Sequence, residues 1–161
     1  MFREEDRLKR NYDSLVMDAQ TRVKEIQPWD LKNLLDSGRS LLLLDVREAD
    51  EFARLRIPGS VNVPRGVLEQ SCEWDYEETL PELASGHDRE IVVICRSGKR
   101  SVVAADTMQK LGFSSVVSLR SGVRGWNDFE QPLLNWEGHP VDSDAAEEIL
   151  ASHPRPEQRR P

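Results

Sequence analysis

The sequence predicts an α/β domain in which helices cover both faces of a parallel β-sheet. Short, mostly apolar runs rich in leucine and β-branched residues occur at 41–46, 91–94 and 116–119. Segments with apolar residues at helical spacing separate these runs, and Gly38 and Gly112 mark the ends of two of them. Strands that are apolar on both sides are typical of parallel sheets whose two faces are covered by helices.

An amphipathic helix is predicted at the start of the chain. Between Phe2 and Gln20, apolar residues recur every three or four positions among charged ones, which leaves a thin apolar stripe. We expect a solvated helix that leans on the domain, and the alternative is a dimerisation or docking arm. The predicted organisation is an N-terminal helical extension at 1–21, a main domain at 22–142 and a C-terminal tail at 143–161.

Within the main domain, the predicted strands and helices alternate. Pro28 is typical of a first helical turn, and a glycine is typical of the position that follows a helix. In chain order, the predicted elements are a strand at 23–26, a helix at 28–38, a strand at 41–46, a helical turn at 48–52, a turn with a minimal strand at 57–64, one or two short helices in a loop at 65–83, a strand at 91–94, a helix at 101–111, a strand at 116–119 and a short helix beyond Val141.

Length and composition restrict the class of protein. A chain of 161 residues suits one domain with a single core, and its net charge of -7 opposes general attraction to nucleic acid or to anionic membranes. Two cysteines, Cys72 and Cys95, are too few for a disulfide framework or a zinc cluster, so no metal is expected. The chain has no apolar run of the length of a membrane span or a signal peptide, and we expect a cytoplasmic protein.

Cys95 lies where the strand at 91–94 ends and a helix begins. Gly98 allows the backbone to turn tightly with its N–H groups pointing inward, and the helix start adds partial positive charge. Arg96, Lys99 and Arg100 lie in the same turn, and such cations favour the thiolate form of a cysteine. An inert buried cysteine is the alternative, but a packing residue has no need of a cationic turn. We therefore interpret Cys95 as a nucleophile.

Four motifs, in order along residues 23–142, resemble those of the rhodanese family of sulfurtransferases, specifically its single-domain members. The motifs are 44–48 with 51–52, then 57–64, the loop 95–101 and the closing motif 122–126. The resemblance implies a five-stranded parallel sheet and a cysteine, Cys95, that carries sulfane sulfur as a persulfide without a cofactor. It also implies that the loop binds substrate, through Arg96, Ser97, Gly98, Lys99, Arg100 and Ser101.

By this resemblance, Cys95 takes sulfur from a donor such as thiosulfate and passes it to a thiol or to cyanide, and a sulfur-carrier protein is a further candidate partner. The second enzymatic class to consider is a cysteine-dependent phosphatase or arsenate reductase. Those loops place the arginine six positions after the cysteine, whereas Arg100 is five after Cys95. The smaller ring suits one sulfur atom better than a phosphate. The third class is a rhodanese-like binding module without activity, but such modules lack the cysteine.

Other polar residues of the motifs are interpreted as structural supports. Asp45 and Arg47 are expected to hold the end of the second strand, and contact between Arg47 and a bound anion is the alternative. Arg124 resembles a structural arginine of the family. Arg56 stands where many members have histidine, and we expect it to cover the surface rather than bind an anion. Cys72 is interpreted as an ordinary cysteine, with a resolving thiol as the alternative.

Overall fold

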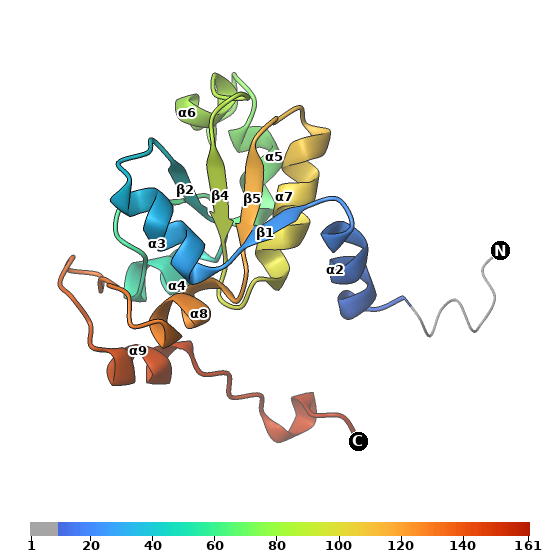
Figure 1. The fold of residues 1–161 in the computed structure, drawn as a ribbon. Coiled ribbons are helices and arrows are strands. Elements are labelled where there is room, and N and C mark those ends of the chain that lie inside the picture. Colours follow the sequence, from blue (N-terminus) through green and yellow to red (C-terminus); the bar gives the residue numbers. More distant parts are fainter. Residues whose placement is uncertain (1–9) are drawn as a thin grey trace.

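The computed structural model describes residues 10–161, and its centre is one parallel β-sheet (Figure 1). The strands are β1 (Lys24–Ile26), β2 (Leu42–Asp45), β3 (Val61–Asn62), β4 (Ile91–Ile94) and β5 (Val116–Leu119). Their order across the sheet is β1-β5-β4-β2-β3. The predicted five-stranded parallel sheet is thus confirmed, and β4, which leads into Cys95, is its central strand.

Helices cover both faces of the sheet, as predicted. The helices of one face are α2 (Tyr12–Gln20), α5 (Leu68–Ser71), α6 (Pro81–Ala84) and α7 (Lys99–Lys110). The other face packs against α3 (Pro28–Asp36), α8 (Gly122–Asp128) and α9 (Ser143–Leu150), and the short α4 (Ala49–Arg54) follows β2. Alternate residues of each strand enter opposite cores: Val93 packs in the first cluster and Val92 in the second. The sheet is therefore buried on both sides.

Helix α7 begins at Lys99, two residues before the predicted start at 101. Gly98 precedes it with φ +97°, a left-handed conformation that L side chains rarely adopt. Lys99 and Arg100 consequently belong to the first helical turn.

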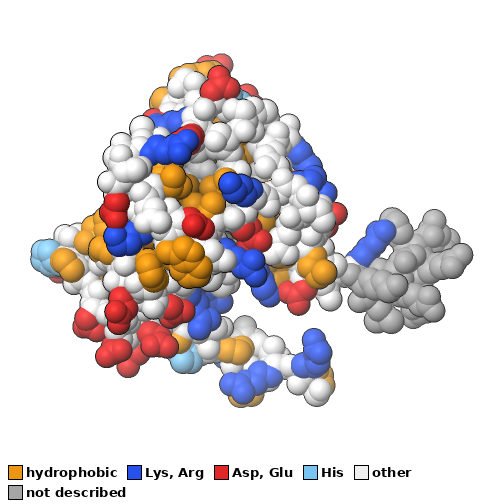
Figure 2. Space-filling model, viewed as in Figure 1, with side chains coloured by type: hydrophobic (Ala, Val, Ile, Leu, Met, Phe, Trp, Pro, Cys, Tyr) orange, Lys and Arg blue, Asp and Glu red, His pale blue; other side chains and the backbone are white. Residues whose placement is uncertain are grey.

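The short helix predicted beyond Val141 is α9. It contacts α8 and buries Ala146 and Leu150 in the second core cluster, so the packed part of the chain extends through Leu150. Figure 2 shows acidic side chains gathered over this helix, and its exposed residues include Asp144, Glu147 and Glu148. A 3₁₀ turn (Pro156–Gln158) follows in the exposed C-terminal segment, and a second one (Arg65–Val67) precedes α5.

Helix α2 is firmly attached to the domain. Its apolar side buries Val16 and Ala19 in the core cluster that contains α7, which is the expected packing of an amphipathic helix. The side chain of Asn11 caps its N-terminus. Just beyond its C-terminus, Arg22 donates two hydrogen bonds to Asp106 of α7, at 2.7 and 3.0 Å. The part of the predicted helix at 2–9 lies outside the described residues.

Candidate active site

The sulfur of Cys95 lies inside the turn that joins β4 to α7. The backbone N–H of Gly98 donates a hydrogen bond to the Cys95 Sγ atom at 3.0 Å, and the Ser101 hydroxyl oxygen lies 3.3 Å from it. Ser101 is itself held by Gly98 O at 3.2 Å and by the Ser118 hydroxyl at 2.8 Å. Cys95 is 1% exposed. The nucleophile candidate is thus buried, but a peptide N–H and a hydroxyl face its sulfur.

The start of α8 holds the loop from behind. The N–H of Val123 donates to Cys95 O at 2.9 Å, and the N–H of Arg124 donates to Arg96 O at 3.0 Å. The backbones can approach this closely only because residue 122 is glycine: a Cβ there would lie 2.3 Å from Cys95 O, and its φ is +59°. The closing motif therefore supports the loop through its backbone, a role that the sequence did not reveal.

Two of the three loop cations are paired with carboxylates. Arg100 donates to both carboxylate oxygens of Glu51 in α4, at 2.8 and 2.9 Å, and Lys99 Nζ lies 2.8 Å from Asp13 Oδ1 in α2. The hydrogen bond from Arg100 lowers the pKa of Glu51, and that from Lys99 lowers the pKa of Asp13. Arg96 forms no ion pair within residues 10–161. Sequence reasoning missed both carboxylates.

Asp45 and Arg47 form a buried ion pair at the end of β2. Arg47 Nη2 lies 2.8 Å from Asp45 Oδ2 and 2.6 Å from Leu55 O, and neither side chain is more than 2% exposed. Asn62 Nδ2 donates to the backbone oxygens of both residues. The Nε and Nη2 atoms of Arg47 are engaged in these contacts, which connect β2, β3 and the end of α4.

The remaining arginines named from the sequence lie elsewhere. The Arg124 side chain is exposed, and Arg124 contacts the loop through its backbone N–H. Arg56 donates to Asn135 O at 2.7 Å, and its guanidinium lies over the Phe52 ring. The guanidinium of Arg56 therefore stabilises the backbone near residue 135.

Cys72 lies at the end of α5 and is 1% exposed. Both cysteines of the chain are free. Burial raises the pKa of the Cys72 thiol to about 11, and the nearby carboxylates Glu73 and Glu69 act in the same direction. Near neutral pH this residue is a thiol, the poorly nucleophilic form.

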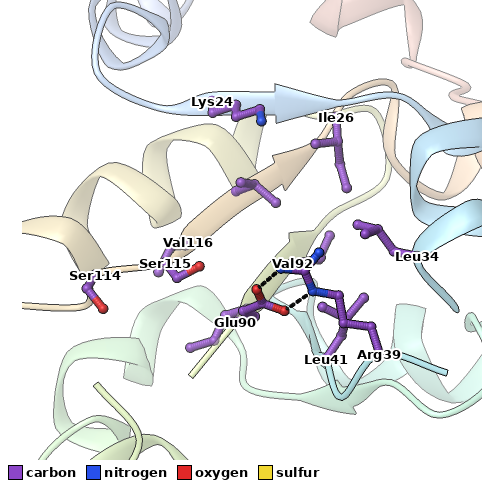
Figure 3. Close-up of a pocket in the computed structure, with 12 residues that line it drawn as sticks. Lys24, Ile26, Leu34, Arg39, Leu41, Glu90, Val92, Ser114, Ser115 and Val116 are labelled. Carbon is purple, nitrogen blue, oxygen red and sulfur yellow. Dashed lines mark hydrogen bonds and ion pairs between the residues drawn. The ribbon is translucent and has the colours of Figure 1, made fainter. Parts of the chain in front are cut away.

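A hollow of about 420 Å³ lies at the opposite end of the strands (Figure 3). Apolar side chains such as Ile26, Leu34 and Val92 line it, and an Arg39–Glu90 ion pair crosses its edge. It has no cysteine among its lining residues. Within residues 10–161, no cluster of three His, Cys, Asp or Glu side chains could hold a metal, and no helix is long and apolar enough to cross a membrane.

A family model described as "Rhodanese-like domain" matches residues 27–129, which include the Cys95 loop, the Asp45–Arg47 pair and the start of α8. The chain belongs to the rhodanese-like family. The matched region begins after α2, so this helix and its Asp13 precede the part that the family defines.

Known relatives in the family carry sulfur-related names. The Bacillus subtilis "Putative sulfur carrier protein YrkF" is 39% identical over 104 residues, which are 65% of this chain and 51% of YrkF. The chain thus spans about half the length of that relative. Human single-domain sulfurtransferase TSTD1 is 27% identical with a TM-score of 0.58, covering 66% of this chain and 96% of TSTD1.

A second solved structure carries a different name. RPA3614 from Rhodopseudomonas palustris, a protein of unknown function described as a possible tyrosine phosphatase, has a TM-score of 0.69 and 28% identity. The match covers 76% of this chain and 93% of RPA3614. Solved structures similar to this chain therefore carry both sulfurtransferase and phosphatase descriptions, and the choice between these functions depends on the site.

Proposed function

We propose that this chain is a sulfurtransferase that moves sulfane sulfur through a persulfide on Cys95. The observation that carries the proposal is the hydrogen bond of 3.0 Å from the Gly98 N–H to the Cys95 sulfur. A donor in this position can stabilise negative charge on a sulfur atom inside the loop. The names of TSTD1 and YrkF support the same class of chemistry.

In the first half-reaction, the Cys95 thiolate attacks the outer sulfur of a donor such as thiosulfate. A new S–S bond forms to Cys95, the S–S bond of thiosulfate breaks, and sulfite leaves with the bonding electron pair. In the second half-reaction, a thiolate or cyanide attacks the terminal persulfide sulfur, and the Cys95 thiolate is released. Charge and atoms balance in both steps, and neither needs a metal or an organic cofactor. A sulfur-carrier protein is proposed as an alternative partner.

A phosphatase function is the second candidate, because of the description of RPA3614. A phosphate monoester needs an arginine that is free to bind two of its oxygens. Arg100 instead makes both of its short hydrogen bonds to Glu51. The geometry around Cys95 therefore favours transfer of a single sulfur atom.

Intact-mass spectrometry tests the proposal directly. After incubation with thiosulfate, or in parallel with methanethiosulfonate, we expect the protein to gain the mass of one sulfur, and peptide mapping should place it on Cys95. Cyanide should then remove it and yield thiocyanate. Absence of this mass gain with both donors, together with hydrolysis of an aryl phosphate, would reverse the order of the two candidates.

A further inference from the structure

The charge of the Cys95 loop is largely compensated from outside the loop. Arg100 is held by Glu51, and the Lys99 ammonium is held by Asp13, which lies in α2. Lys99 Nζ also lies 5.5 Å from the centroid of the Tyr12 ring. Of the three cationic loop side chains, Arg96 is the one that has no ion pair within residues 10–161.

Helix α2 and the loop face each other across a groove of about 490 Å³, which is lined on one side by Asp13, Val16 and Met17 and on the other by Ser97–Lys99. The two sides of the groove keep their relative positions because α2 is anchored to α7 by its buried residues and by the Arg22–Asp106 contacts. Asp13 is thus fixed beside the loop, although it belongs to a segment that precedes the family match.

The first turn of α2 lies within electrostatic range of the active sulfur. Burial raises the pKa of Tyr12; the charge of Cys95 acts in the same direction, and the charges of Arg100 and Lys99 oppose it. Asp13 is the next residue in the chain. A full negative charge in this place changes the potential that an approaching anion meets.

We propose that Asp13 is a specificity-determining residue: by neutralising Lys99 it weakens attraction of dianionic donors, so that the loop favours sulfane-sulfur donors with one negative charge over thiosulfate. This rests on the proposed sulfur transfer. Asp13 acts through Lys99 and does not itself touch the reacting atoms.

Two donors that differ by one charge test this selectivity. Thiosulfate carries two negative charges and releases sulfite, whereas methanethiosulfonate carries one and releases methanesulfinate. In Asp13→Asn, we expect kcat/KM for thiosulfate to rise about threefold to tenfold relative to that for methanethiosulfonate, as estimated for one unit charge at close range. The change should appear mainly in KM and should shrink as added salt shortens the Debye length.

Asp18→Asn is the matched control. Asp18 lies on the same helix, pairs with Arg22 at 2.7 Å and is 65% exposed, compared with 70% for Asp13. The substitution Asp18→Asn removes one negative charge from α2, as Asp13→Asn does, but leaves the partner of Lys99 in place. Asp13→Glu should keep the wild-type ratio, because it keeps a negative charge beside Lys99.

Alkylation of Cys95 gives a readout that needs no sulfur transfer. Peptide mass spectrometry measures the alkylation rate of Cys95 with anionic iodoacetate and with neutral iodoacetamide. Asp13→Asn should raise the ratio of the iodoacetate rate to the iodoacetamide rate by a similar factor, and Asp18→Asn should leave this ratio unchanged. Equal ratios in both variants would overturn the role of Asp13. If neither donor loads Cys95 but the alkylation ratio changes, the electrostatic role stands and the sulfur-transfer proposal fails.

Discussion

Cys95 and Cys72 are equally buried, at 1% exposure each, but their surroundings differ. Cys95 follows β4 in the turn before α7, where the Gly98 N–H donates to its sulfur. Cys72 belongs to the same apolar cluster, but it follows the short helix α5, and the charges near it are the carboxylates Glu73 and Glu69. Burial alone does not decide what a cysteine does. Hydrogen-bond donors and the sign of nearby charges decide whether a buried sulfur can hold negative charge.

The largest expected difference between the two regions is in activity. Cys95→Ser should abolish sulfur transfer from thiosulfate to cyanide, because a serine hydroxyl cannot form the persulfide. Thiocyanate formation measures this. Cys72→Ser is the matched control and should retain activity within about twofold, since Cys72 takes part in no step of the proposed mechanism. A comparable loss in Cys72→Ser would instead support its role as a resolving thiol.

The second difference is in backbone packing. Gly122→Ala should lower the free energy of unfolding by about 3 kcal/mol or more, because the new Cβ meets the Cys95 carbonyl at 2.3 Å and φ is positive. Urea denaturation measures the change. Gly66→Ala, in the turn before α5, is the control: its Cβ would meet nothing within 4 Å, and its effect should stay within about 1 kcal/mol. Equal effects would contradict the close approach of α8 to the loop.

The sequence was sufficient to predict the sheet and the position of the candidate nucleophile. The mostly apolar runs at 91–94 and 116–119 are β4 and β5 with the same bounds, because a strand buried on both faces is apolar at nearly every position. Cys95 was identifiable because the change from strand to helix and the loop motif are both local in the chain.

The pairing of the loop cations could not be predicted in the same way. Arg100 and Glu51 are 49 residues apart, and Lys99 and Asp13 are 86 apart, so no local pattern connects them. The sequence shows three cations in one turn, whereas the fold supplies two carboxylates from α4 and α2. Similarly, the glycine at 122 looked like part of a motif, and only the packed backbones explain why it cannot carry a side chain.

The protonation of Cys72 gives the third difference. In Cys95→Ser, which isolates Cys72, alkylation by iodoacetamide at pH 8 should be about a hundredfold slower in the folded protein than in denaturant. The raised pKa of about 11 leaves little thiolate, and burial restricts access. Stopped-flow or mass-spectrometric rates measure this, and the folded rate should increase with pH towards pH 11. An alkylation rate in the folded protein equal to that in denaturant would show that Cys72 is accessible and that its pKa is not raised.

The smallest expected difference concerns ion pairs in the two regions. The Arg100–Glu51 pair beside Cys95 is partly buried and has two short hydrogen bonds, whereas the Arg65–Glu69 pair near Cys72 is more exposed. Glu51→Gln should lower the free energy of unfolding at pH 7 by about 1 kcal/mol, and Glu69→Gln by a few tenths, roughly 0.3 kcal/mol.

The pH dependence separates an ion pair from a packing effect at Glu51. Arg100 lowers the pKa of Glu51 in the folded chain below its ordinary value of 4.5. A carboxyl group with a depressed folded pKa contributes stability that is fully present above the unfolded value and is lost as pH falls through the folded value. The difference between wild type and Glu51→Gln should therefore be constant from pH 6 to 8 and decrease steadily below about pH 4.5. A stability difference that persists unchanged at pH 3 would mean that Glu51 stabilises the loop by packing and not through its ion pair with Arg100.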